Sequence, residues 1–233
     1  MSNLFRPSSS SEENEWLSVS DMMAGLMVIF LFIAILPRSQ IDTPEEAAIQ
    51  CWWKKENEIY QALFREFEHD LPAWEAEIQR NPILIRFKSA EVLFESGSAE
   101  IKPKFKDRLE DFFPRYAREL RPFKEDIEEL RIEGHTSSEW QKAKTEQESY
   151  FHNMKLSQER TRSVLQYVLT DPTLYFDKKW VQPLLTANGL SFSKRIMKNN
   201  TEDKKTSRRV EFRVSTKARG VLTGIVEGTN IAC

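Results

Sequence analysis

A single acidic side chain, Asp21, lies near one end of the most apolar stretch of the chain, WLSVSDMMAGLMVIFLFIAIL at residues 16–36. No other charged residue lies within residues 16–36. About 20 helical residues span the roughly 30 Å core of a bilayer, so we expect a transmembrane helix over residues 16–37. A carboxylate at that depth is costly and usually carries a proton or another ion. Asp21 also suits the N-cap of a shorter helix that begins at Met22, so the residues alone leave the carrier and the cap open.

The charges that flank this stretch neither favour a cleaved signal peptide nor orient a membrane helix. A signal peptide begins with a basic region and ends in a small-residue cleavage site, whereas here one arginine precedes three glutamates and no A-x-A site follows. The far flank is also acidic, with Arg38 followed by three acids. Because Lys and Arg near the ends of a span set its orientation, the flanks do not decide it.

No other group of residues has the spacing of a catalytic or metal site. The three histidines, His69, His135 and His152, are scattered, and the H-E-x-x-H pattern that places two ligands on one helix face does not occur. The G-x-S-x-G pattern of a nucleophilic serine is also missing, and the seven glycines form no phosphate-binding loop. The sequence therefore predicts a protein that is not an enzyme and uses no cofactor or metal.

The rest of the chain has the composition of a soluble domain. Its 233 residues have a formal net charge of −2 and a mean hydropathy of −0.55, and the balanced charge argues against a nucleic-acid-binding protein. The two cysteines, Cys51 and Cys233, both follow the apolar stretch and would share a compartment. A disulfide within or between chains requires that compartment to be oxidising, and free thiols are the default expectation.

A polar tail and a helical linker flank the apolar stretch. Residues 1–15 show no periodicity and predict a disordered tail, whereas residues 38–80 predict a linker made largely of helix. Apolar residues recur there at spacings of three and four from Ile49 to Ile78, and Pro72 is expected to break or kink the helix. This apolar face suits a self-pairing stalk, a lid on the next domain, an interfacial helix, or simple packing onto that domain, which is the default.

Residues 81–217 alternate between strand and helix patterns, and residues 218–233 are assigned to a C-terminal tail. Two-residue alternation predicts strands at residues 83–87, 129–133, 181–186 and 210–214, and helical spacing predicts helices at residues 105–120 and 155–169. This order predicts an α+β fold, a β-α-β-α-β sandwich with one sheet and its helices on one face.

Four motifs in this region occur in the order found in a known family. VLFESGSAEIKP, IEGHTS, NMKLSQERTRSV and SRRVEF lie between Leu84 and Val214, and with them the region resembles the OmpA-like peptidoglycan-binding domain. A short tail and one membrane helix with an early aspartate precede it, a layout that resembles the MotB family of ion-driven stator subunits. Within that group, the stretch at residues 16–35 is most similar to the ZorB family of the Zorya anti-phage defence system.

The resemblance implies that the domain binds the peptide stem of peptidoglycan. In the family, an arginine in an N-x-x-L-S-x-x-R run holds the diaminopimelate carboxylate, which a guanidinium can bind with two hydrogen bonds, and an aspartate after G-H-T holds the amine. The run is intact here, whereas Ser137 replaces the aspartate and a longer polar loop, EWQKAKTEQESYF, follows it. This replacement implies weaker binding, use of Glu139 instead, or a different stem. The implied contact residues are Thr136, Ser137, Asn153, Leu156, Ser157, Arg160 and Arg208.

Two further residues near these motifs have structural alternatives. Arg208 and Arg209 match the family's paired arginines near the last strand, and a structural ion pair with an acid on the sheet is as good an interpretation as ligand contact. His135, at the end of a predicted strand, is expected to make structural hydrogen bonds.

The resemblance also implies how the chain is placed in the cell. The N-terminus would be cytoplasmic and the C-terminal domain periplasmic, with a single pass through the bacterial inner membrane. Asp21 would carry the ion of a proton-driven motor, and because one helix cannot shield a charge from lipid, a multi-span MotA-like (ZorA-like) subunit is implied. A homodimer within a hetero-oligomer is expected. The alternatives are a flagellar-type stator subunit, a passive peptidoglycan-anchored membrane protein, and a force-transducing subunit of the TolR or ExbD kind.

Overall fold

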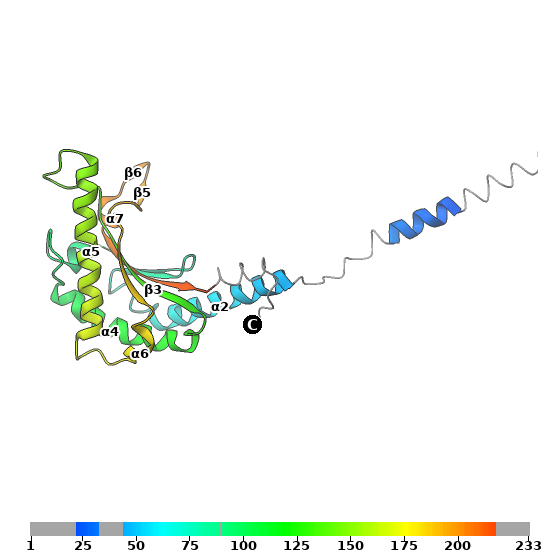
Figure 1. Ribbon diagram of the computed structural model, residues 1–233, viewed down its shortest axis with the longest axis horizontal. Coiled ribbons are helices and arrows are strands. Elements are labelled where there is room, and N and C mark those ends of the chain that lie inside the picture. Colours follow the sequence, from blue (N-terminus) through cyan, green and yellow to red (C-terminus); the bar gives the residue numbers. More distant parts are fainter. Residues whose placement is uncertain (1–21, 33–43, 89, 218–233) are drawn as a thin grey trace, which may run out of the picture. The chain divides into compact units, whose positions relative to one another are not determined.

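The computed structural model describes residues 22–32, 44–88 and 90–217 of the chain, which divides into two units at residues 47 and 48. In the first unit, residues 22–32 form a helix, blue in Figure 1, and all of its side chains are exposed. No helix in the described residues is both long enough and apolar enough to cross a membrane.

Several predictions fall on residues outside the described ones. These are Asp21, the ends of the predicted transmembrane segment at residues 16–37, and the tails at residues 1–15 and 218–233. The transmembrane helix and the two tails therefore stay predictions.

The second unit is built on a mixed sheet of five strands in the order β1-β2-β7-β3-β4 (Figure 1). The strands are β1 (Ala76–Gln79), β2 (Leu84–Lys88), β3 (Ile127–His135), β4 (Leu185–Gly189) and β7 (Arg209–Thr216). β3 and β4 run parallel, and the other neighbouring strands are antiparallel. The last strand in the chain, β7, thus lies at the centre of the sheet, between β2 and β3.

Three long helices form the second layer: α2 (Pro44–Phe67), α4 (Pro103–Leu120) and α5 (Glu146–Thr170). The short elements are α3 (Ala90–Leu93), the 3-10 helix η1 (Arg121–Phe123), α6 (Lys178–Val181), α7 (Lys204–Ser207) and the hairpin of β5 (Met197–Lys198) and β6 (Thr201–Glu202).

Helix α4 follows its sequence pattern closely. It begins at Pro103, where proline's missing N–H is not needed because the first turn has no intrahelical acceptor for it. The apolar residues that predicted the helix are all buried: Phe105, Leu109, Phe112, Tyr116 and Leu120. The prediction of this helix and of its inward face is confirmed.

One face of the sheet is apolar and carries the long helices. Phe87 of β2 and Phe212 of β7 point to this face, and their ring centroids lie 5.2 and 4.9 Å from that of Phe112 on α4. Phe67 of α2 and Val164 of α5 belong to the same buried cluster. The opposite face of the sheet carries charged side chains. The predicted α+β sandwich with helices on one face is therefore confirmed, with one strand more than expected in this sheet and a separate β5–β6 hairpin that was not expected.

The linker prediction was wrong about where the first helix ends. α2 stops at Phe67, whereas the pattern predicted helix as far as Ile78. A turn follows that contains Pro72 and Glu75, the latter at φ 54°, and Ile78 then lies in β1. Spacing misled the prediction because a buried turn and an edge strand continued the apolar pattern of the helix.

Two later boundaries also differ. α5 begins at Glu146, nine residues before the predicted start, because Thr145 caps it by accepting a 3.1 Å hydrogen bond from the Glu148 N–H. The last part of the predicted polar loop is therefore helix. The strand predicted at residues 181–186 is β4, which begins later because Val181 belongs to α6.

The second half of α2 is part of the domain core. Ile59, Leu63 and Phe67 are completely buried, and the Phe67 ring centroid lies 5.2 Å from that of Phe112. Among the interpretations of the apolar face, packing onto the domain is confirmed for this half. Cys51, in the first half of α2, is disulfide-bonded, so the expectation of a free thiol is wrong there. The other cysteine of the chain, Cys233, lies outside the described residues.

Candidate functional site

Two glycines bring α5 unusually close to the sheet. A Cβ atom on Gly189 of β4 would lie 2.3 Å from the backbone nitrogen of Gln158, and one on Gly134 of β3 would lie 2.7 Å from Thr161 Cγ2. Real side chains do not approach backbone so closely, so only glycine permits this contact. The middle of α5, with Arg160, is therefore held directly against the ends of β3 and β4.

The Arg160 guanidinium is buried and is held by backbone carbonyls. Its Nε donates to the Ser98 carbonyl at 2.8 Å and its Nη2 to the Glu95 carbonyl at 3.3 Å. Its central carbon lies 4.9 Å from the centroid of the Phe94 ring, at cation–π distance. These three residues belong to the turn between α3 and α4, where Gly97 adopts a positive φ of 65°. The VLFESGSAEIKP motif thus provides the surface on which the arginine lies.

No carboxylate among the described residues pairs with Arg160. Burial, together with the positive charge of Arg208, lowers the pKa of Arg160 to about 10. Arg160 is 7% exposed, so its cation is desolvated without a counter-ion. Such a group favours an anion that arrives with a ligand.

The other residues of the N-x-x-L-S-x-x-R run have structural roles. The Asn153 Nδ2 donates to the Glu139 carbonyl at 3.2 Å and to the Ser149 carbonyl at 3.1 Å, which fixes the loop before α5. The Ser157 Oγ accepts from the Ser191 N–H at 3.1 Å, which joins α5 to the segment after β4. Leu156 is buried. The run therefore positions Arg160 and the loops around it.

Thr136 and Ser137 follow the end of β3 and connect to the same segment. The Thr136 N–H donates to the Ser191 carbonyl at 2.9 Å. Because the Ser191 N–H donates to Ser157, Ser191 links Thr136 to α5. The Thr136 Oγ1 is buried and has no hydrogen-bond partner in the part of the chain that the structure describes. Ser137 is 3% exposed and brings no charge.

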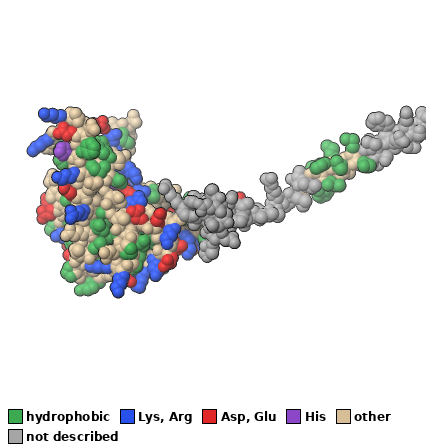
Figure 2. Space-filling model, in the orientation of Figure 1, with side chains coloured by type: hydrophobic (Ala, Val, Ile, Leu, Met, Phe, Trp, Pro, Cys, Tyr) green, Lys and Arg blue, Asp and Glu red, His purple; other side chains and the backbone are tan. Residues whose placement is uncertain are grey.

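Glu139, the alternative acid for the ligand's amine, is already engaged by basic residues. Lys204 Nζ lies 2.6 Å from Glu139 Oε1, and Arg208 Nη1 lies 3.8 Å from its Oε2. The hydrogen bond from Lys204 lowers the pKa of Glu139. Figure 2 shows lysine and arginine side chains beside acids at the end of the domain where α5 begins.

The β5–β6 hairpin is a support that sequence reasoning missed. Its two turn residues, Asn199 and Asn200, have φ of 49° and 63°, the left-handed conformation that a tight two-residue hairpin requires and asparagine tolerates. Glu202 of this hairpin accepts a 3.0 Å hydrogen bond from the Ser138 N–H, next to Ser137. The available signal was the Asn-Asn pair in MKNNTE.

On the other face of the sheet, Glu133, His135 and Glu211 bring three ligand-type atoms within 4.8 Å of one another. The geometry suits a metal ion, but the charges do not. Arg209 Nε lies 2.6 Å from Glu211 Oε1, and Arg213 Nη2 lies 3.0 Å from Glu133 Oε2. A cation would add charge to a buried cluster that guanidinium groups already neutralise. The interpretation as an ion pair with an acid on the sheet therefore applies to Arg209, whereas Arg208 approaches Glu139.

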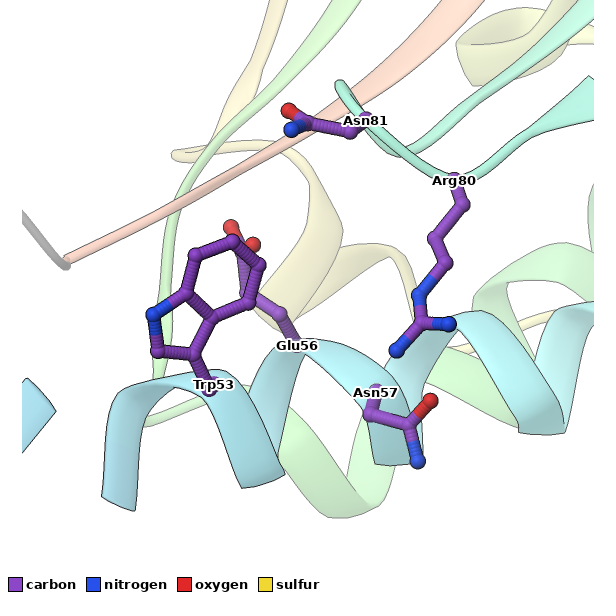
Figure 3. A pocket seen from close by; sticks show the side chains of 5 residues that line it. All are labelled: Trp53, Glu56, Asn57, Arg80 and Asn81. Carbon is purple, nitrogen blue, oxygen red and sulfur yellow. The ribbon is translucent and has the colours of Figure 1, made fainter. Parts of the chain in front are cut away.

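A separate cleft between α2 and the β1–β2 turn is too small for a ligand. Its lining residues are Trp53, Glu56, Asn57, Arg80 and Asn81 (Figure 3). Its volume of about 20 Å³ has room for one water molecule. The Arg160 site is the stronger candidate for binding.

The fold is that of a known domain family. The model of the OmpA family matches residues 93–209 of the chain. Among solved structures, a MotB-like protein of Desulfovibrio vulgaris is similar at 23% identity and a TM-score of 0.47, over 74% of this chain and 96% of that one. The cell wall anchor of the Pseudomonas aeruginosa T6SS is similar at 22% identity and a TM-score of 0.45, over 66% and 96%.

A curated relative matches nearly the whole chain. Zorya protein ZorB of Escherichia coli is 43% identical over 225 residues, which cover 95% of this chain and 96% of that protein. The chain therefore belongs to the OmpA family and, within it, to the family of Zorya protein ZorB.

Proposed function

We propose that the chain is a peptidoglycan-anchored, stator-like subunit of an ion-driven motor in the bacterial inner membrane, acting in anti-phage defence. The anchoring part depends on one observation. The buried Arg160 guanidinium has no carboxylate partner among the described residues. An arginine that stabilised only the fold would be expected to have one, because a buried charge without a partner is costly.

A peptide carboxylate fits what Arg160 offers. Backbone carbonyls engage Nε and Nη2, and no described residue accepts a hydrogen bond from Nη1. A guanidinium fork binds a carboxylate with charge-assisted hydrogen bonds, which are roughly twice as strong as neutral ones. The stem peptide of peptidoglycan, the ligand that the family resemblance implies, carries such a carboxylate on its diaminopimelate residue.

Replacing Arg160 tests the anchor. The full chain in detergent should sediment with purified sacculi, and Arg160→Ala should reduce the bound fraction by an affinity loss of about tenfold or more, since a charged hydrogen bond contributes about 1.5–3 kcal/mol. Arg162→Ala is the matched control, because Arg162 is exposed on the same helix. Thermal unfolding first checks that both variants are folded. If Arg160→Ala then sediments as well as the control, wall binding at this site is refuted.

The motor part of the proposal concerns Asp21. Membership in the ZorB family and the exposed apolar helix at residues 22–32 support a membrane-inserted segment with Asp21 at its start. A carboxyl group can take up and release a proton, and acids within membrane segments are typical of proton and ion pathways. Moving one charge through 100 mV supplies about 2.3 kcal/mol. A multi-span MotA-like subunit would supply the shielding that one helix cannot.

The variant Asp21→Asn removes the titratable group and keeps the shape. We expect cells with this variant to lose phage protection while the protein still reaches the membrane and co-purifies with its multi-span partner. Glu15→Gln, an acid just outside the apolar stretch, is the control and should protect normally. Full protection by Asp21→Asn would leave the passive anchor as the better function.

A further inference from the structure

We infer that the Arg160 site selects a stem peptide whose diaminopimelate amine is acylated, as it is in a cross-link, over a peptide whose amine is free and positively charged. The inference rests on the proposed function, because it specifies which form of that ligand the site accepts. It follows from the charges that the described residues place around Arg160.

Two further basic side chains, Arg208 and Lys204, lie on the segment next to the site. The positive charge of Arg208 acts on Arg160, and Lys204 lies within 2.6 Å of the same Glu139 carboxylate that Arg208 approaches. Arg160 lies on α5, whereas Lys204 begins α7 and Arg208 is the residue that ends it, so the cations come from two elements. A ligand ammonium would therefore enter a region of like charge, where such juxtaposition disfavours binding.

The acids near the site already have partners. Glu139 pairs with Lys204, Glu202 accepts hydrogen bonds from Ser138, and the Glu95 carboxylate lies 3.7 Å from Lys102 Nζ. A ligand ammonium would have to compete with these partners for a counter-ion. A neutral amide needs no counter-ion.

The groups at the end of β3 suit a neutral ligand group. Ser137 is buried and uncharged, and the neighbouring Thr136 has a buried hydroxyl with no hydrogen-bond partner among the described residues. A hydroxyl both donates and accepts, so it can serve the N–H or the carbonyl of an amide. A hydroxyl cannot neutralise an ammonium. The site thus combines one strong cation for the carboxylate with neutral groups beside it.

Isothermal titration of the full chain in detergent with three synthetic stem peptides tests this. The first peptide has a free diaminopimelate amine, the second has that amine acetylated, and the third has lysine in place of diaminopimelate and so lacks the carboxylate. We expect the acetylated peptide to bind about tenfold more tightly than the free one, a difference of about 1.4 kcal/mol. The lysine peptide should bind most weakly.

The variants Ser137→Asp and Ser137→Ala sharpen the test. An added carboxylate should reverse the preference toward the free amine, whereas Ser137→Ala should keep the preference for the acetylated peptide. If the buried aspartate prevents folding, the three-peptide comparison with the unchanged chain decides alone.

The outcomes separate this inference from the proposed function. No binding of either diaminopimelate peptide, or binding that Arg160→Ala does not weaken, would overturn the proposed function itself. Equal or tighter binding of the free amine, with Arg160 still required, would overturn only the selectivity. In that case loss of the free-amine preference in Glu139→Gln would identify Glu139 as the group that binds the amine.

Discussion

At the scale of single residues, the charged face of the sheet shows how two opposing glutamates are tolerated. Glu133 and Glu211 are directly opposite each other on β3 and β7, an arrangement that is destabilising for like charges. His135 Nε2 lies 3.7 Å from Glu133 Oε2 and 3.4 Å from Glu211 Oε2, and the arginines of β7 neutralise both carboxylates. The cluster links the two central strands, β3 and β7, on the charged face of the sheet.

This cluster predicts how stability depends on pH. Burial alone would raise the pKa of Glu211, but the neighbouring His135 and the charge of Arg209 outweigh it and hold this pKa well below its usual range. A folded-state pKa below the unfolded value, about 4.3, means that ionised Glu211 stabilises the fold above that pH. The stabilisation is lost as the pH falls below about 4.

The variant Glu211→Gln should therefore lower the free energy of unfolding at pH 7 by about 3 kcal/mol, because it leaves buried arginines without a counter-ion. It should also flatten the acid limb of a plot of stability against pH. Glu128→Gln, which changes an exposed acid of the neighbouring strand β3, is the control and should do neither. Urea unfolding from pH 3 to 8 measures both effects. If stability falls as steeply at acid pH in Glu211→Gln as in the unchanged chain, groups other than Glu211 cause the loss of stability.

At the scale of elements, sequence pattern predicted what depends on local periodicity. The α4 face and the alternation of β2 and β7 could be read because their alternating apolar residues belong to one buried cluster, which includes Ile85, Phe87, Val210, Phe212 and Val214. β1 could not, since four half-buried residues after a proline-containing turn continue a helical spacing. Alternation marks a strand only where one face is more buried than the other, and β1 has no such difference between its faces.

The candidate site likewise has one part that sequence pattern predicted and one part that it did not. The run that ends in Arg160 was recognisable because it lies on one helix. The partners of Arg160 could not be predicted. It is held by the carbonyls of Glu95 and Ser98 and by the Phe94 ring, and every residue type has a backbone carbonyl. The engagement of Glu139 by Lys204 depends on a hairpin that brings together residues 65 positions apart. Such contacts follow from topology.

At the scale of the whole molecule, the boundary of the OmpA-family domain lies earlier than its motifs suggest. A fragment that begins at residue 81, as the motifs propose, would lack β1 and five buried apolar residues: Ile59, Leu63, Phe67, Leu71 and Trp74. At about 1.5–3 kcal/mol for each buried side chain, the loss is roughly 7–15 kcal/mol. That equals the entire stability of a typical domain, about 5–15 kcal/mol.

We therefore expect a fragment of residues 81–233 to lack a cooperative unfolding transition, whereas residues 48–233 should fold. Urea unfolding followed by near-ultraviolet circular dichroism compares the two. Removing α2 also removes Cys51, which is disulfide-bonded, so residues 48–233 with Cys51→Ser are the matched control. If that control folds and residues 81–233 do not, packing of α2 explains the difference. If residues 81–233 and residues 48–233 unfold at the same urea concentration, the domain does not need α2 for its stability.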